Sequence, residues 1–574
     1  MSSKYINSNY RISRRNATIF ILVGFLAIQN LAFQIIFKLN IPYSIDFSDV
    51  FSPMFNQIVK DEFSFLVNKG IHIIFFPKLI SYPNFYLNSF DVVNLTYIYW
   101  IVTSITLFVM YLMIKQTDKR LFWTLIPISA FLYNPLTSSG YWMVGMLAWY
   151  FPMLGITSII YLLNRKTINL KIFTSGISLA IFSTFSILIG IISWIGGFLM
   201  LLKLASKKQL ENKKWILLWI LSTSAVGFMY LQLTSGISEP IHFDSLFSFT
   251  GFSFIANFIS SSFRLKYEIL MISTGTVSII LSIIYYWYFL KKKWIKQYFP
   301  WFALLLTALC GSIITALGRA NLEYHLGNEP YYSTISQLFH ISLIILTGKL
   351  IIDLKTNSYK RKLIVILLIL VILSQMIMLL PSYYSGWQRG EYYFDEKMDF
   401  VNCFSLNPDS HCLERYDEYG NDFLQMINYL IENELSIFGE SLLKNEYEVN
   451  KKFNIIQNLP EISTVNTFES DNNKKIQQTV KYELDSELFI LNGWFLTPSD
   501  SIPNSLFLLV DEIPLLENKI FQVEQNSKVQ NTTRISWSIF FPSGYIDSGC
   551  HTIKLIGSNE IEKIILDNDL IICK

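Results

Sequence analysis

Long runs of apolar residues, separated by short polar connections, dominate the first two thirds of the chain. Because a helix needs about 20 mainly apolar residues to cross a bilayer, the pattern predicts eleven membrane-spanning helices. They lie near residues 17–37, 91–114, 121–138, 142–163, 172–188, 190–205, 215–234, 269–290, 299–317, 332–352 and 363–380. The predicted fold class is therefore an α-helical polytopic membrane protein.

Lysine and arginine are distributed unevenly between the connections. Each connection that follows an even-numbered span is basic, as Lys119 and Arg120 illustrate, whereas the loop Ser235–Glu268 carries only Arg264 and Lys266. Because cytoplasmic loops hold the excess of positive charge, the pattern predicts a multi-pass protein of the cell membrane with a cytoplasmic N-terminus and an extracytoplasmic C-terminal part. The first span lacks a small-residue cleavage site, so we expect it to remain as an anchor.

Composition supports a division into two bodies. The 574 residues are 52% hydrophobic and only 16% charged, against roughly 25% charged in soluble domains. Residues 1–380 hold 31 Lys and Arg against 13 Asp and Glu, while residues 381–574 hold 15 against 30. A basic membrane body and an acidic soluble tail are expected. The basic residues are spread over six short loops, so they indicate orientation and no nucleic-acid partner.

The acidic tail changes its pattern once. Residues 381–475 are predicted to form an external, mainly helical segment, because apolar residues recur there at offsets of three and four. From residue 476 to 574 short β-rich runs alternate with turn signals such as Pro542-Ser543-Gly544. Several short strands within about 100 residues favour an antiparallel β-sandwich. The transmembrane domain, residues 1–380, includes a long first external loop, residues 38–89.

Four of the five cysteines lie in the predicted external tail, where disulfides can persist. An even count predicts two bridges, and pairing within each subregion is the simplest arrangement. Four cysteines nevertheless allow three connectivities, and buried free thiols are the alternative. The predicted pairs are Cys403–Cys412 and Cys550–Cys573, and the sequon Asn531-Thr532-Thr533 makes Asn531 a candidate glycosylation site.

The first external loop carries the acids nearest to the membrane. No phosphate-binding glycine loop, HExxH, CxxC or GxSxG motif occurs in the chain, which argues against a soluble type of nucleotide enzyme. Asp46 and Asp49 follow the first span closely, and carboxylates so close to the apolar core need a partner, a metal or a function. They are candidate catalytic residues or ligands of a divalent metal; solvated loop acids or a helix-capping role for Asp49 is the alternative.

Two further groups supply cationic and aromatic side chains. His72 and Lys78 lie later in the same loop, where together with the acids they provide the parts needed to deprotonate an acceptor and hold a phosphate. A structural histidine and a snorkelling lysine are the alternative. Arg319 follows the ninth span and suits a phosphate-bearing headgroup, unless Glu323 or Glu329 neutralises it. Tyr332 follows in the same cluster.

These residues carry a resemblance to a group of largely uncharacterised multi-spanning prokaryotic membrane proteins. Their first external loop has an acid after span one and then a motif close to N-E-H-R-I-F-F-P-R-L. The matching positions are His72, Ile74, Phe75, Phe76, Pro77 and, in place of arginine, Lys78; Gly70, Ile71 and Ile73 replace the Asn, Glu and first Arg. The resemblance covers most of residues 40–440, through Trp142, Trp149, Thr184-Phe185-Ser186, Gly318-Arg319, Tyr332-Ser333-Thr334, Cys412 and Leu435-Ser436-Ile437-Phe438.

The topology in turn resembles the C-type glycosyltransferases. What that resemblance implies is transfer of a sugar from a polyprenyl-phosphate donor to a glycan, lipid or protein acceptor on the outer face. Asp46 or Asp49 would act as base or metal anchor, and Arg319, with Lys78 or His72, would bind the donor phosphate. The tail sandwich, with Gly493-Trp494 and Gly549-Cys550-His551-Thr552, is similar to β-domains of cell-surface glycan enzymes.

Two other functions fit the same sequence. A transporter or flippase of lipid-linked glycans would share the membrane location, although internal repeats and mid-span charges, typical of transporters, are not visible. A non-catalytic scaffold, including a relative that has lost catalysis, would use the sandwich to bind glycan or protein. The scaffold would tolerate loss of Asp46, Asp49 and Arg319.

Overall fold

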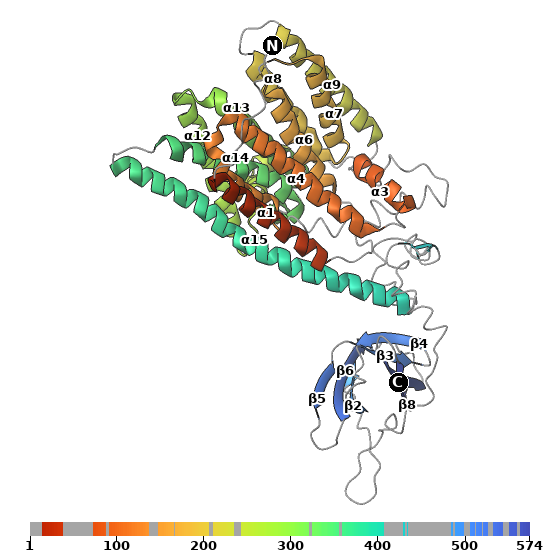
Figure 1. Cartoon of the computed structure of the whole chain (residues 1–574). Helices are drawn as coiled ribbons and strands as arrows, with labels where there is room; N and C mark the ends of the chain where they lie inside the picture. The colour runs from red at the N-terminus through yellow and green to blue at the C-terminus, as the bar shows by residue number, and fades with distance from the viewer. Residues whose placement is uncertain are drawn as a thin grey trace, which may run out of the picture. The chain divides into compact units, whose positions relative to one another are not determined.

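The computed structural model divides the chain into two compact units, Met1–Asp395 and Glu396–Lys574 (Figure 1). Each unit is described by itself. The structure describes residues 14–37, 73–87, 91–136, 147–165, 167–205, 211–234, 243–320, 324–354, 359–406, 429–430, 433, 435, 484–485, 488–498, 505–510, 513–518, 521–525, 532–542, 550–558 and 563–573.

The first unit is helical and carries the membrane-spanning segments. Within the described residues, eight helices are long and apolar enough to cross a bilayer, as expected of a membrane-embedded helical protein. They are α1 (Arg14–Ile36), α4 (Val92–Thr117), α8 (Ile192–Ala205) with the turn before it, α9 (Glu211–Leu233), α12 (Glu268–Lys291), α13 (Ile295–Arg319), α14 (Ser333–Asp353) and α15 (Tyr359–Leu406). All eight coincide with predicted spans.

The other three predicted spans contain shorter helices. These are α5 (Leu125–Leu132), which follows the 3₁₀ helix η2 (Lys119–Thr124), α6 (Leu147–Leu163) and α7 (Leu170–Thr184). A helix rises 1.5 Å per residue, so α5 is too short to cross a bilayer alone. The eight long helices thus support a polytopic protein without establishing the expected number of eleven spans.

A tight reversal separates α7 from α8. The short η5 (Leu188–Ile191) joins them, and a Cβ atom added at Gly190 would lie 1.8 Å from the carbonyl oxygen of Ser183. Only glycine permits this close approach between the returning backbone and the end of α7. The sequence places two apolar stretches here, and the glycine explains how so few residues can connect them.

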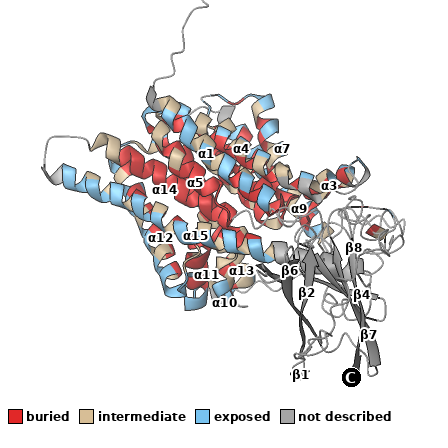
Figure 2. Ribbon diagram, turned by 60° about the horizontal axis from the view of Figure 1, so that its bottom comes forward, coloured by how far each residue is buried: buried red, intermediate tan, exposed pale blue. Residues whose placement is uncertain are grey.

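Helix α14 forms the centre of the unit. Every residue from Ser333 to Leu350 is buried, and Figure 2 shows α14 and α5 as the most continuously buried helices in the bundle. Small residues permit this packing: a Cβ atom at Gly348 would lie 3.1–3.2 Å from side chains of Leu121, Thr124 and Trp123. Because α14 has neighbours on all sides, its polar side chains must find partners inside the protein.

A short buried helix occupies the stretch that the sequence analysis treats as the loop Ser235–Glu268. Helix α10 (Phe243–Leu246) precedes α11 (Phe249–Ser260), and most of α11 is buried. Gly275 of α12 allows the two backbones to meet, since a Cβ atom there would lie 2.0 Å from the carbonyl oxygen of Ala256. At 12 residues α11 is too short to span a bilayer, which is why span length alone does not reveal it.

Helix α15 continues through residue 380, where the sequence analysis ends the transmembrane domain. It runs for 48 residues, and Figure 1 shows α1 lying alongside it. Trp387 packs against Phe33 and Phe37, with ring centroids 5.5 and 5.1 Å apart. The division between the two units falls after Asp395. Beyond α15, most of the predicted helical segment 381–475 lies outside the described residues.

The second unit contains two four-stranded antiparallel sheets, in the orders β1-β2-β6-β5 and β4-β3-β7-β8. The strands are β1 (Leu484–Asp485), β2 (Leu488–Pro498), β3 (Ser505–Val510), β4 (Ile513–Asn518), β5 (Phe521–Gln525), β6 (Thr532–Pro542), β7 (Cys550–Ser558) and β8 (Lys563–Cys573). Cys550 and Cys573 are directly opposite each other in the β7–β8 ladder. Of the other predicted pair, Cys403 lies in α15 and Cys412 lies outside the described residues, as does Asn531.

Candidate functional site

Arg319 is the last residue of α13, where the chain turns back toward α14. The turn contains two 3₁₀ helices, η6 (Tyr324–Asn328) and η7 (Pro330–Tyr332). The second helix brings two phenols under the arginine: Nη1 of Arg319 donates a hydrogen bond to the hydroxyl of Tyr331 over 3.1 Å, and the guanidinium also interacts with the hydroxyl of Tyr332. Arg319 is half-buried, so it lies between the apolar bundle and its surface.

Aromatic side chains hold the two tyrosines in place. Trp149 of α6 packs against Tyr331 and Tyr332, with ring centroids 4.8 and 5.4 Å apart. On the other side Phe258 of α11 lies 4.7 Å from the ring of Tyr332, which is only 1% exposed. Tyr332, expected from the sequence to bind substrate, is therefore buried, whereas Tyr331 and Arg319 are half-buried.

The charge of Arg319 is not neutralised within the described part of the chain. Arg319 forms no ion pair with any Asp or Glu among those residues. Glu329, one of the two candidate partners, instead acts electrostatically on Arg264 and Tyr331. Glu323, the other candidate, lies outside the described residues. The structure thus removes Glu329 as a direct partner of Arg319.

Two further arginines lie at this end of the unit, and sequence reasoning missed them as site residues. Nη1 of Arg264, in the turn between α11 and α12, donates a hydrogen bond to the carbonyl oxygen of Asn328 over 2.7 Å. Arg264 adopts a φ of 46°, a left-handed conformation that costs a non-glycine residue roughly 1–2 kcal/mol. Burial lowers the pKa of the Arg264 guanidinium, the positive charge of Arg389 in α15 lowers it further, and Glu329 opposes this change.

Hydrogen bonds hold the backbone around this group. Asn134 donates to the hydroxyl of Ser382 in α15 over 2.7 Å and to the carbonyl oxygen of Ser262 over 3.4 Å. It thereby ties α15 to the turn that carries Arg264. At Gly386 the backbone of α15 lies close to the segment after α5, because an added Cβ atom would lie 2.4 Å from the backbone nitrogen of Leu136.

Arg264 and Arg389 are both half-buried, and the charge of Arg389 acts on Arg264. Among the described residues, Glu329 is the carboxylate that acts on Arg264. Partly buried charges of like sign repel each other and lose hydration. Arg319 is also half-buried, but the groups that act on its guanidinium are Tyr331 and Tyr332. Because guanidinium groups bind phosphate and carboxylate oxygens in pairs, Arg319 is suited to an anion.

The predicted catalytic loop is only partly visible. Asp46, Asp49 and His72 lie outside the described residues. Lys78 lies in α3 (Phe75–Leu87) and is 1% exposed, so it does not snorkel to water. An aromatic chain joins α3 to the helix that carries Trp149: Phe76 packs on Phe182, and Phe182 packs on Phe151, each at 4.7 Å. Helix α3, which carries Lys78, is thus packed against α7 and, through Phe182, against α6.

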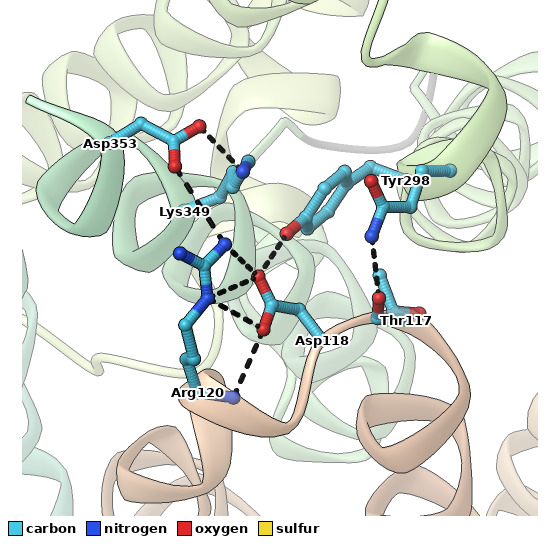
Figure 3. Close-up of polar contacts among 7 residues, drawn as sticks. Thr117, Asp118, Arg120, Tyr298, Lys349 and Asp353 are labelled. Carbon is cyan, nitrogen blue, oxygen red and sulfur yellow. Dashed lines mark hydrogen bonds and ion pairs between the residues drawn. The ribbon is translucent and has the colours of Figure 1, made fainter.

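A second group of charges surrounds Asp118, which caps η2 (Figure 3). Its carboxylate accepts hydrogen bonds from Nη2 of Arg120 over 2.7 Å and from the hydroxyl of Tyr298 over 3.1 Å. Burial alone would raise the pKa of Asp118, but the hydrogen bonds from Arg120 and Tyr298 outweigh it, so the pKa lies below its usual value.

Helix α14 completes the Asp118 group. Lys349 and Asp353 pair over 2.5 Å, and Asp353 also lies 3.8 Å from Arg120. The Lys349 ammonium lies 4.5 Å from the centre of the Trp294 ring. Two acids and two bases balance, so this group needs no ligand. It ties η2 to α13 and α14, and we assign it a structural role.

Comparisons with known proteins supply no family for this chain. No family model, no curated protein and no solved structure matches it. Within the described residues no three His, Cys, Asp or Glu side chains gather as metal ligands; the predicted metal candidates Asp46 and Asp49 are not among those residues. Arg319, without a carboxylate partner among the described residues, is therefore the strongest functional candidate in the described part of the chain.

Proposed function

We propose that the protein is an integral membrane glycosyltransferase. It moves a sugar from a polyprenyl-phosphate-type lipid donor to a glycan, lipid or protein acceptor at the outer face of the membrane. The observation that carries the proposal is Arg319: a half-buried guanidinium at the end of an apolar helix, resting on Tyr331, without a carboxylate partner among the described residues. A lipid phosphate whose tail lies in the bilayer would present its anion at such a position.

The proposed roles follow from charge and from the family resemblance. Arg319 binds the donor phosphate, assisted by Lys78 or His72. Asp46 or Asp49 takes the proton of the acceptor hydroxyl, or anchors a divalent metal that would do so through a bound water. A lipid-linked donor reaches the site from within the bilayer, which fits a chain without a nucleotide-binding motif.

We assign binding of the acceptor to the C-terminal tail. We infer that the two antiparallel sheets of the second unit pack as a β-sandwich on the outer face, where they bind glycan or protein. Their antiparallel order is typical of such domains. In this assignment the cysteine pairs lie in an oxidising compartment, and the membrane domain delivers the activated sugar while the tail retains the acceptor.

The test compares surface glycans and glycoproteins by mass spectrometry. A deletion strain is complemented with wild type, Asp46→Asn, Asp49→Asn, Arg319→Ala or the matched control Lys266→Gln, which removes an exposed cation. Expression and membrane insertion are measured for each variant. We expect the deletion to remove one sugar unit, the control to restore it, and Arg319→Ala together with one of the Asp variants to fail.

Two results would favour the other functions. If every variant restores a lost glycan as well as wild type does, the catalytic assignment is wrong, and a scaffold takes its place. If the deletion instead causes complete lipid-linked glycans to accumulate on the inner face, the protein transports such lipids. Isolating the lipid fraction from the deletion strain separates this outcome from a missing transfer step.

A further inference from the structure

Helix α12 ends in a turn that places a lysine in an unfavourable backbone conformation. The backbone N–H of Trp294 donates to the carbonyl oxygen of Phe289 over 3.0 Å, and the N–H of Lys293 donates to that of Leu290 over 3.0 Å. Lys293 adopts a φ of 59°. This is the Schellman arrangement, in which the left-handed position usually holds glycine because a side chain is strained there. A lysine at this position therefore costs stability that glycine would not.

Several exposed lysines surround this turn. We define the lysine surface as Lys119, Lys291, Lys292, Lys293 and Lys296, all of them exposed. Four lie at or beside the turn between α12 and α13, and Lys119 is the first residue of η2. Gln297 of α13 donates a hydrogen bond to the carbonyl oxygen of Thr117 over 2.7 Å, which holds the start of α13 beside η2. The five positive charges thus lie at one end of the bundle.

The charges of the lysine surface are not compensated. Within the described part of the chain, none of these five lysines forms an ion pair. The neighbouring carboxylates of Asp118 and Asp353 are already paired with Arg120 and Lys349 (Figure 3). Like charges that lie so close together repel each other and create a positive potential over the surface. An anion bound from outside would remove this repulsion.

Aromatic side chains indicate where the lysine surface lies relative to the bilayer. Trp287 and Tyr286 of α12 are 64% and 42% exposed, and Trp287 comes one helical turn before Lys291. Exposed Trp and Tyr near the end of an apolar spanning helix gather at the level of the lipid headgroups. An acidic protein would match the charges alone, whereas a phospholipid matches both the lysines and the aromatic side chains beside them.

We propose that the lysine surface binds the headgroups of anionic phospholipids, and that Lys293 keeps its strained conformation for this contact. Lysine attracts phosphate as a point charge, and lysine clusters beside a spanning helix recognise anionic lipids. Lys296 and Arg319 lie near opposite ends of the 25-residue helix α13, about 35 Å apart at 1.5 Å per residue. The inference is therefore independent of the proposed sugar transfer.

The test measures equilibrium binding of tritiated lipids to the purified full-length protein in a non-ionic detergent. The probes are dioleoylphosphatidylglycerol, which carries one negative charge, and dioleoylphosphatidylcholine, which has the same chains and no net charge. We expect the anionic lipid to bind at least about tenfold more tightly and to raise the melting temperature, as a ligand of the folded state does. Because salt screens exposed charges, the preference should shrink in about 1 M sodium chloride.

Lys293→Gly is the most informative variant, because it removes the charge and the strain together. It should weaken binding of phosphatidylglycerol about fivefold, equivalent to about 1 kcal/mol for one lysine near a lipid surface. Without lipid, its melting temperature should equal or exceed that of wild type, which guards against misfolding. The triple variant Lys291→Gln, Lys292→Gln and Lys296→Gln should lose the preference. Lys266→Gln, which removes an exposed cation beside the other end of α12, should bind as wild type does.

Four results would overturn the inference. The first is equal binding of the two lipids by wild type, and the second is unchanged binding in both Lys293→Gly and the triple variant. Polyglutamate that binds more tightly than phosphatidylglycerol would assign the surface to an acidic protein. Inorganic phosphate that displaces the lipid at equal concentration would assign it to a soluble anion. The glycan test changes none of these lysines, so either test can fail while the other succeeds.

Discussion

The Nε2 atom of His340 in α14 lies 2.8 Å from the carbonyl oxygen of Ile259 near the end of α11. The hydroxyl of Ser336, one turn earlier in α14, donates to the same oxygen. The last carbonyls of a helix have no partner within it, and α11 ends in the protein interior, away from water. The buried polar side chains of α14 thus satisfy the end of a helix that the sequence analysis did not anticipate.

We expect that either His340 or Ser336 can satisfy the Ile259 carbonyl when the other is replaced. His340→Phe keeps a ring beside Phe131, on which the imidazole stacks, and should lower the free energy of unfolding by about 0.5–1.5 kcal/mol, as should Ser336→Ala. The double variant leaves the Ile259 carbonyl without a side-chain donor, so its cost should exceed the sum by about 1 kcal/mol. Thermal unfolding of the purified protein measures this; strictly additive losses would contradict the shared role.

Gly275 should be intolerant of a side chain. Gly275→Ala forces a methyl group onto the backbone of α11 at Ala256, and such overpacking typically costs about 1–3 kcal/mol. Gly227 provides the matched control, because it lies in the apolar helix α9 with nothing within 4 Å of an added Cβ atom. Gly227→Ala should be neutral or slightly stabilising. If the two variants melt at the same temperature, the close contact between α11 and α12 is wrong.

Because of Asp118, the free energy of unfolding should depend on pH in the acidic range. Its pKa is lower in the folded protein than the unfolded value of about 3.9, so the carboxylate stabilises the fold above that value and loses this contribution as the pH falls through the folded pKa. At neutral pH, Asp118→Asn should cost about 1–3 kcal/mol. The difference in melting temperature from wild type should shrink below pH 4. Asp244→Asn, at an exposed position, should follow wild type throughout; a constant difference for Asp118→Asn would contradict the assignment.

Cys550 and Cys573 should be joined. Directly opposite residues of an antiparallel pair have Cα atoms about 4.5–5.5 Å apart, a separation that a disulfide can bridge, and the register places these two cysteines so. Mass spectrometry of a non-reduced digest should recover the two cysteine peptides as one species, which reduction separates. The same digest tests Cys403–Cys412. Alkylation of Cys550 without prior reduction would exclude the bridge in the second unit.

Features that depend only on neighbouring residues could be predicted from the amino-acid sequence. A run of about 20 apolar residues needs no tertiary contact to be recognised as a span, and the eight long helices coincide with such runs. The short strands of the tail were also predicted from β-rich runs between turn signals, and β6 ends at Pro542, the first residue of one such signal. The sequence also singled out Arg319, because an arginine beside an apolar helix is locally anomalous.

Contacts between residues far apart in the chain could not be predicted, because they form only when the helices pack together. Nothing in the local sequence around Arg264 and Arg389 indicates that their charges act on each other, because the turn after α11 and helix α15 meet only on folding. The buried helix α11 was not predicted for a related reason. Its 12 residues are too few for a span, and its partners on α12 and α14 follow later in the chain. Hydrophobic length is a local property of a chain, whereas the balance of charge at a site is a sum over segments that folding assembles.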